Sequence, residues 1–168
     1  MLTEAQEKYL LTIPDDILVR IKDFDSMIYD ISSKLIKKIK DTTGLGVGFW
    51  GASALGIAGQ NDIDLNILSE PAEYYIYLPK LKELFGEPKK EIPSLVKWEF
   101  NQDGFDVELY LTNKNSLQLA EQRRVYEILK SNQELYSDYE KLKRESDGIS
   151  FRDYMRRKYE FFNKILSL

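Results

Sequence analysis

The segment from Asp62 to Leu68 most constrains the fold, because polar and apolar residues alternate along it. This alternation predicts a β-strand that packs one face on the core and lines a cleft with the other. Asp62 and Asp64 lie two residues apart, so their side chains point to the same face. Two neighbouring carboxylates repel each other unless a cation neutralises them. Mg²⁺ is the usual cation, and it often binds together with phosphates. The segment therefore predicts a site for nucleotide chemistry.

A second strand with the same pattern is predicted from Phe105 to Leu111, after a turn at Asp103-Gly104. An Asp-Gly pair between two strand-like runs is a strong signal for a hairpin. Asp106 and Glu108 share one face of this strand. If the two acidic strands are neighbours, three or four carboxylates line one cleft and can hold Mg²⁺ or Mn²⁺. An acidic face can also be simply a solvated one, and Asp106 and Glu108 are both possible third acids.

The turn Gly51-Ala52-Ser53 precedes the first acidic strand. Gly51 lets the backbone approach phosphates, and Ser53 offers them a hydroxyl and an amide group. By itself, Gly51 is more typical of a simple turn, and Ser53 is more typical of a helix cap. Together with the two acidic strands, the turn favours a nucleotide-binding site.

The remaining segments predict helices around a small sheet. An amphipathic helix is expected from Pro14 to Ile39, because apolar residues recur every three or four positions, and Gly44 lies beyond its end. Residues 74–77 fit either a helix or a strand. Other predicted elements are strands at 47–50 and 95–100, a helical turn or loop at 54–58, and helices at 79–85, 117–129, from Asn132 to before Gly148, and 150–166.

Composition excludes several classes of active site. The chain has no cysteine and no histidine, so disulfides, thiolate nucleophiles, imidazole zinc sites and serine–histidine triads are ruled out. A net charge of −4 argues against a broad nucleic-acid-binding surface. No apolar run approaches the roughly 20 residues that span a bilayer, and the N-terminus does not resemble a signal peptide. We therefore expect a cytoplasmic protein that does not bind membranes.

The order of these motifs resembles the polymerase-β-type nucleotidyltransferase superfamily. That pattern is a Gly-[Gly/Ser] turn, then acid-apolar-acid, then a third acid on a later strand, which here spans about Val47 to Leu111. The resemblance implies an α/β (α+β) nucleotidyltransferase fold, with a short, mixed, twisted sheet flanked by helices. We expect one domain over residues 1–168, with a core at about 14–112 and a C-terminal helical portion at about 115–168.

The chain is also similar to the GrpB family, a branch of this superfamily, over about Gly48 to Leu166. The family's first motif, Gly-Ser-Thr-Ala then Gly-Leu, corresponds to residues 51–58 here, and three helical motifs correspond to residues 123–126, 138–143 and 154–161. Many members have a histidine before the turn and Lys-Pro before the acidic strand, where this chain has Trp50 and Gln60-Asn61. Many members also lack one aspartate of the pair, whereas this chain keeps both.

Basic residues of three helices are candidate triphosphate ligands. Arg124, Lys143 and Lys158 would bind the phosphates if they converge on the cleft. Each can alternatively lie on a solvated helix face, which we expect for Arg156 and Arg157. Tyr139 and Tyr154 are separate candidates, either for core packing or for stacking on a base.

The expected activity is Mg²⁺-dependent nucleotidyl transfer from a nucleoside triphosphate such as ATP to an acceptor that is a small molecule, a protein or RNA. Asp62, Asp64 and either Asp106 or Glu108 would be the catalytic and metal-binding residues, with Gly51 and Ser53 at the phosphates. Two alternatives stay open. One is a catalytically silent protein that binds a nucleotide or cofactor, and the other is an antitoxin-like interaction protein.

Overall fold

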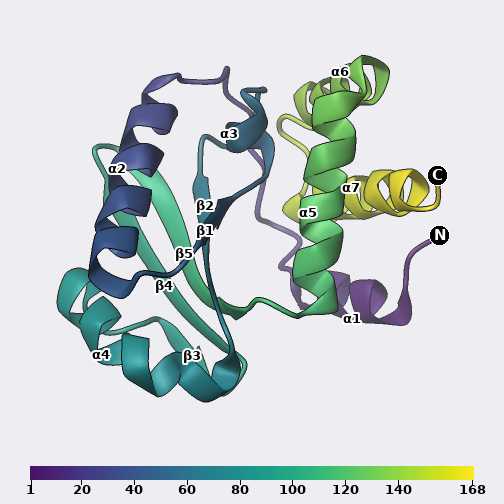
Figure 1. Ribbon diagram of the computed structural model, residues 1–168. Helices are drawn as coiled ribbons and strands as arrows, with labels where there is room; N and C mark the ends of the chain where they lie inside the picture. The colour runs from purple at the N-terminus through teal and green to yellow at the C-terminus, as the bar shows by residue number, and fades with distance from the viewer.

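The computed structural model describes residues 1–168 and contains a five-stranded mixed sheet with helices on both sides (Figure 1). The strand order is β1-β2-β5-β4-β3, in which only the central pair β2–β5 is parallel. The predicted mixed α/β architecture is confirmed. The strands are β1 (Val47–Phe49), β2 (Ile63–Ser69), β3 (Lys90–Ile92), β4 (Leu95–Gln102) and β5 (Phe105–Asn113).

One face of the sheet carries the main core. Alternate residues of β2 and β5 point into it and are buried, including Leu65 and Leu109 at 0% exposure. The helices α2 (Met27–Thr43) and α4 (Tyr74–Phe85) cover this face through apolar residues such as Ile28 and Leu81. Each fully buried side chain of this size stabilises the fold by roughly 1.5–3 kcal/mol relative to exposure. The opposite residues of β2 and β5 therefore face away from this core.

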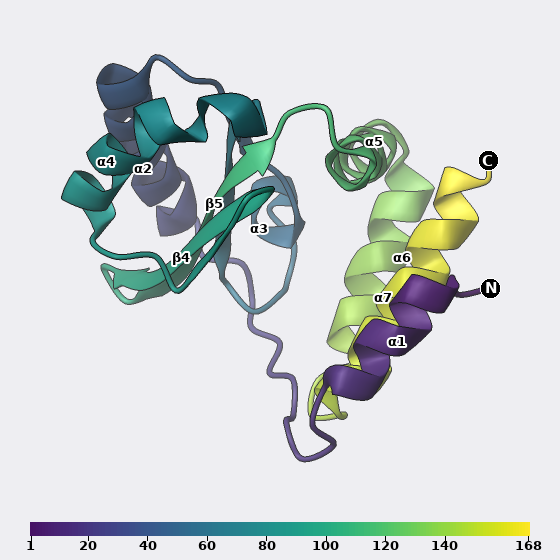
Figure 2. The ribbon, with the colours of Figure 1, turned by 90° about the horizontal axis from the view of Figure 1, so that it is seen from below.

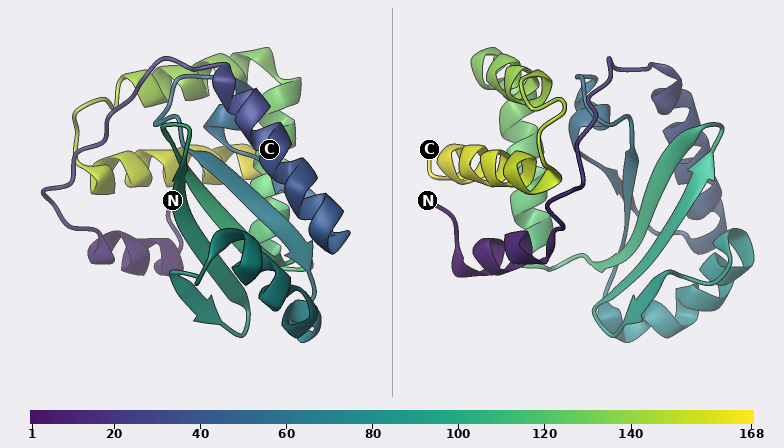
Figure 3. Two further views of the ribbon diagram at one scale, coloured as in Figure 1. Left: turned by 90° about the vertical axis from the view of Figure 1, so that its left-hand side faces the viewer. Right: turned by 180° about the vertical axis from the view of Figure 1, so that it is seen from behind.

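A layer of four helices lies across from that opposite face (Figures 2 and 3). It combines α1 (Glu4–Thr12) with α5 (Leu117–Ser131), α6 (Gln133–Arg144) and α7 (Phe151–Leu166). The caps predicted at Asn132 and Ser150 are confirmed, because each side chain accepts a backbone hydrogen bond from the first turn of its helix. None of the helices has the length and apolar character needed to cross a membrane.

The helix predicted from Pro14 is wrong over its first half. Residues 13–26 form an extended segment, and α2 begins only at Met27. The backbone N–H of Val19 donates to the Ile149 carbonyl at 3.0 Å, and that of Lys22 donates to the Gly59 carbonyl at 2.7 Å. These bonds to distant parts of the chain satisfy backbone groups that a helix would satisfy internally, so tertiary contacts override the helical periodicity.

Smaller differences concern short elements. The ambiguous residues 74–77 belong to α4, so Pro79 lies inside that helix rather than at its start. Neither α1 nor β3 is among the predicted elements, although Thr3 and Gln6 form a capping box at the start of α1. The segment after Gly51 forms the short helix α3 (Ala52–Leu55), and then a loop leads to β2.

Candidate functional site

Two acidic side chains meet where β2 and β5 lie side by side. Asp64 and Glu108 are direct partners in the parallel register, so their side chains project from the same face of the sheet. Their carboxyl groups are within hydrogen-bonding contact of each other. Asp62, just before β2, adds a negative charge close to Asp64. The sheet register thus concentrates acidic groups at one place.

The Asp64 carboxyl has a strongly perturbed pKa. Burial, followed by the charges of Asp62 and Glu108, raises the pKa from 3.8 to about 8, whereas Lys158 opposes the shift. A carboxyl group with this environment retains its proton near neutrality unless a cation compensates its charge. The environment therefore favours a bound cation over a free, ionised carboxylate.

The structure selects Glu108 rather than Asp106 as the acid that joins Asp64. The two oxygens of Glu108 accept hydrogen bonds from Lys97 Nζ at 3.0 Å and from the Tyr110 hydroxyl at 2.6 Å. Asp106 lies on the same face but is exposed, and its carboxylate accepts a hydrogen bond from the Asn101 amide at 3.3 Å. Asp106 does not contribute to the pKa shift of Asp64, so it lies outside the acidic pair.

The turn before the acids lies next to them. Gly51 has a φ of 109° and a ψ of −171°, a conformation almost restricted to glycine, and a Cβ at this position would lie 3.7 Å from Asp64 Oδ2. Ser53 is buried, and its hydroxyl donates to the Asp62 carbonyl at 2.6 Å. The Ser53 hydroxyl thus fixes the loop onto the acidic strand, and its backbone N–H lies in the first turn of α3.

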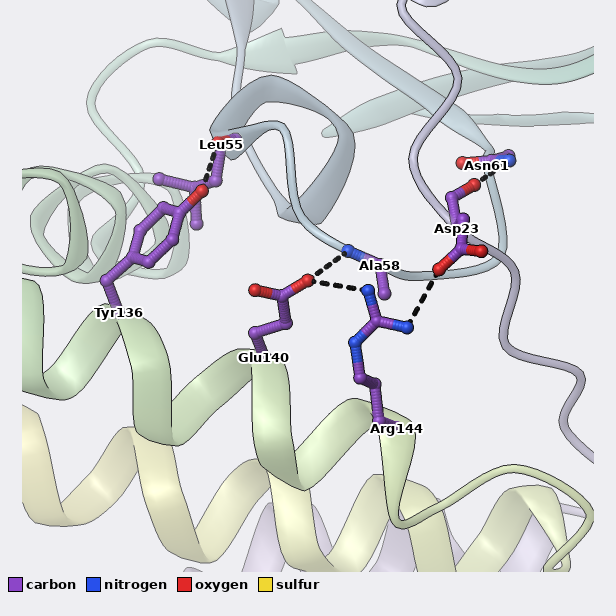
Figure 4. A network of polar contacts seen from close by, with 7 residues as sticks. All are labelled: Asp23, Leu55, Ala58, Asn61, Tyr136, Glu140 and Arg144. Carbon is purple, nitrogen blue, oxygen red and sulfur yellow. Dashed lines mark hydrogen bonds and ion pairs between the residues drawn. The ribbon is translucent and has the colours of Figure 1, made fainter.

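The loop from Leu55 to Asn61 is fastened to α6 (Figure 4). The Tyr136 hydroxyl donates to the Leu55 carbonyl at 3.1 Å, and Glu140 Oε1 accepts from the backbone N–H of Ala58 at 3.3 Å. Arg144 bonds both Glu140, at 3.0 Å, and Asp23, at 2.8 Å. The helical layer therefore positions the loop that joins the Gly51 turn to the acids.

Two of the three candidate phosphate ligands lie near the acids. Lys143 is only 4% exposed, and its ammonium donates to the Tyr154 hydroxyl at 2.6 Å and lies over the ring of Tyr139. Burial and then the charge of Lys158 lower the pKa of Lys143 to about 7, while Asp62 and Asp64 raise it. Lys158 lies across the cleft on α7. Both amines are therefore within electrostatic reach of the acidic pair.

The other basic candidates lie elsewhere. Arg124 is exposed and does not line the cleft. Arg157 is also exposed, as expected, whereas Arg156 is partly buried and forms two hydrogen bonds with Glu7 of α1. Tyr139 and Tyr154 are each 2% exposed and pack with other aromatic rings, which matches the core-packing alternative.

The acidic pair opens into a cleft of about 760 Å³ between the sheet and the helical layer. Asp64, Glu108 and Tyr110 line its sheet side, and Lys158 and Phe162 of α7 line the other. A second hollow of about 510 Å³ lies between α6 and α7, but none of the acidic strand residues reaches it. The first cleft is large enough for a small-molecule ligand.

The residues of this cleft suit Mg²⁺ held together with a substrate. No group of three or more acidic side chains is arranged to hold a metal ion by itself. Mg²⁺ in proteins is commonly bound by one or two carboxylates plus substrate phosphates. Asp64 and Glu108 provide such a pair, and Asp62 adds charge beside it.

Comparison with known protein families shows which family the chain belongs to. The family model described as GrpB protein matches residues 18–168, which include all of the sheet and the helices α2 to α7. The chain belongs to the GrpB family. No curated protein matches the chain. The match begins at residue 18, so α1 lies outside the region shared with the GrpB family.

Two residues around the acids are absent from the sequence-based predictions for this GrpB-family site. Lys97 and Tyr110 both contact Glu108, and they are register partners on β4 and β5. The Asp103-Gly104 hairpin fixes this register, so counting outward from the turn would have placed Lys97 opposite Tyr110 and beside Glu108.

Proposed function

We propose that this GrpB-family protein is a Mg²⁺-dependent nucleotidyltransferase that uses a nucleoside triphosphate. The observation that carries the proposal is the contact between Asp64 and Glu108, with Gly51 beside Asp64. Such a pair supplies oxygen ligands for a cation that also binds phosphates. Lys158 supplies positive charge on the side of the cleft formed by the helices. Lys143 is buried and does not line the cleft, but its charge acts on Asp62 and Asp64.

The reaction is an in-line displacement at the α-phosphorus. An oxygen of the acceptor forms a bond to this phosphorus, while the bond to the oxygen bridging the α- and β-phosphorus atoms breaks. Pyrophosphate leaves with the electron pair of the broken bond. The proton of a hydroxyl acceptor passes to a cleft carboxylate, which acts as a general base. When bound, Mg²⁺ would stabilise the charge on the attacking and departing oxygens.

The cations of the helical layer have a separate role in this proposal. Departing pyrophosphate carries several negative charges, and a partly buried ammonium stabilises them more strongly than an exposed one does. Lys143 and Lys158 are placed for this, because both act electrostatically on the residues around Asp64. Arg124 has no part in it, since it is exposed and does not contribute to the pKa shift of Asp64 or Lys143.

Pyrophosphate release and label transfer test the proposal. Each labelled nucleoside triphosphate is incubated with Mg²⁺, the protein and a cell extract as the source of acceptor. We expect release and transfer with the wild type and their loss with Asp62→Ala/Asp64→Ala. The matched control is Glu134→Ala/Asp138→Ala, which removes two exposed acids of α6. No release with any nucleotide, or equal release by the cleft variant, would contradict nucleotidyl transfer.

A nucleotide-binding protein without turnover is the second candidate function. It is favoured by one observation, namely that both oxygens of Glu108 already have partners in Lys97 and Tyr110. A carboxylate so occupied has less capacity to bind metal or accept a proton. Saturable binding of a nucleoside triphosphate without release of pyrophosphate would favour this candidate.

A further inference from the structure

The cleft continues past the acidic pair toward the end of the sheet where β5 leads into α5. On the sheet side, this inner part is lined by Asn66 of β2 and Thr112 of β5. Both residues lie on the same face as Asp64 and Glu108, since they follow these acids by an even number of positions. The inner part is thus continuous with the proposed phosphate site but has a different chemical lining.

Asn66 and Thr112 are buried polar residues without protein partners. Asn66 is 6% exposed and Thr112 is 9% exposed, and neither side chain forms a hydrogen bond within the protein. Their remaining accessibility is toward the cleft that they line. Their polar atoms are not sealed from solvent, because Asn61 Oδ1 is the only fully buried side-chain nitrogen or oxygen without a partner. They are therefore free to bond a ligand in the cleft. The amide of Asn66 offers two donors and an acceptor to a ligand.

The opposite wall carries aromatic rings among polar side chains such as Gln6, Gln122 and Asn163. Phe162 and Tyr159 of α7 line it together with Tyr9 of α1, and the rings of Tyr9 and Tyr159 meet edge to face at 6.3 Å between centroids. Lys158 is the only basic residue in the cleft lining, whereas Asp64, Glu108 and Glu121 are acidic. This lining suits an uncharged ring that places its face on apolar side chains and its polar edge on the sheet.

We propose that the inner part of the cleft binds the base of the nucleotide, with Asn66 and Thr112 bonded to its polar edge. This rests on the proposed function, because the triphosphate lies at Asp64 and Lys158 while the base extends toward α1. Tyr9 then shapes the base pocket from outside the family-matched region, which begins at residue 18. The choice of nucleotide is therefore made in part by residues that the family model does not include.

Calorimetric binding in the presence of Mg²⁺ tests the proposal with three kinds of probe: the four ribonucleoside triphosphates, their nucleosides, and inorganic tripolyphosphate. Asn66→Leu removes the amide at similar volume, and Thr112→Val replaces a hydroxyl by a methyl group. We expect each to weaken binding of the preferred nucleoside triphosphate by about tenfold, as for a lost buried hydrogen bond, and to leave tripolyphosphate binding unchanged.

Ser69→Ala is the matched control, because Ser69 is a buried polar residue of the same strand that does not line the cleft. Thermal melting shows that each variant is folded. The proposal is overturned if tripolyphosphate binds the wild type as tightly as the triphosphates, or if both cleft variants retain full affinity for nucleotides.

The two proposals can fail separately. Nucleoside binding that Asn66→Leu abolishes, without any release of pyrophosphate, would support the base pocket and contradict nucleotidyl transfer. Pyrophosphate release that is equally fast with all four triphosphates and insensitive to Asn66→Leu would support transfer and overturn the base pocket. If none of the three kinds of probe binds, the base pocket is overturned.

Discussion

At the scale of single residues, the site depends on which acids the sheet register brings together. Asp106 and Glu108 lie on the same strand and the same face, yet only Glu108 contacts Asp64. The difference arises because Glu108 is the direct register partner of Asp64, whereas Asp106 lies just before Val107, where the pairing with β2 begins. The two carboxylates are therefore expected to differ in their effect on the proposed cation site.

Glu108→Gln and Asp106→Asn form a matched pair of substitutions that separates these residues. We expect Glu108→Gln to weaken Mg²⁺ or Mn²⁺ binding at least about tenfold, since one of two carboxylate ligands is lost. Asp106→Asn should leave the affinity close to that of the wild type. Titration calorimetry with nucleotide present measures both. Equal effects of the two substitutions would show that the Asp64–Glu108 contact does not form the site.

Lys143 offers a second comparison, with Arg124. Lys143→Met replaces the buried lysine by an unbranched apolar side chain of similar length. The substitution removes the charge near Asp62 and Asp64. We expect tripolyphosphate binding to weaken about tenfold. Arg124→Met should leave it unchanged, because Arg124 is exposed and does not contribute to the pKa shift of Asp64. Affinity measured at low and moderate salt is the readout. A larger effect for Arg124→Met would contradict the proposed placement of the phosphates.

At the scale of elements, the turn before α3 makes a specific demand on the backbone. Gly51 and Gly86 have nearly the same conformation, with φ of 109° and 80° and ψ of −171° and −166°. A Cβ at Gly86 would meet no atom within 4 Å, whereas one at Gly51 would lie beside Asp64. The two glycines thus share a conformation and differ in their surroundings.

Alanine at either position should destabilise the fold by about 1–3 kcal/mol, because a side chain is strained in this conformation. Only Gly51→Ala should also weaken nucleotide and Mg²⁺ binding, since the new methyl group lies between the backbone and the acids. Chemical denaturation gives the free energy of unfolding, and calorimetry gives the affinity. Loss of binding in Gly86→Ala as well would indicate a general effect of instability.

The sequence-based predictions succeeded where local signals agreed with the tertiary structure. Alternating acidic strands, the Asp103-Gly104 hairpin and the caps at Asn132 and Ser150 were all recovered, since period, turn and capping chemistry are local. The helix predicted after Pro14 was wrong because the backbone of this segment bonds with distant residues, from Gly59 to Phe151. Lys143 was a candidate as a basic residue of a predicted helix, but its burial between two tyrosines could not be deduced without the packing of α6 on α7.

At the scale of the whole molecule, the cleft lies between the sheet and the helical layer. The protonation state of Asp64 in this cleft therefore affects the stability of the whole fold. The Asp64 pKa is about 8 in the folded protein and near 3.8 when exposed. Between these values the folded state holds a proton that the unfolded state has lost. Stability therefore declines as pH rises through this window.

Asp64→Asn should remove this decline, so the variant gains stability relative to the wild type as pH increases from 5 to 7. Mg²⁺ should raise the melting temperature of the wild type more at pH 8 than at pH 5, because the ion competes with protons for the carboxylates. Melting curves at several pH values, with and without Mg²⁺, measure both effects. A constant difference between variant and wild type across this range would contradict the pKa assignment.

The position of α1 has a practical consequence for dissecting the protein. Leu10 and Ile13 pack with Val19 and with Tyr154 and Met155 of α7, although the family match begins only at residue 18. A fragment trimmed to the family boundary would leave this face of α7 exposed to water and would remove the part of the cleft lining that α1 contributes. Such a fragment is expected to self-associate, and a negative assay with it would say nothing about the intact chain.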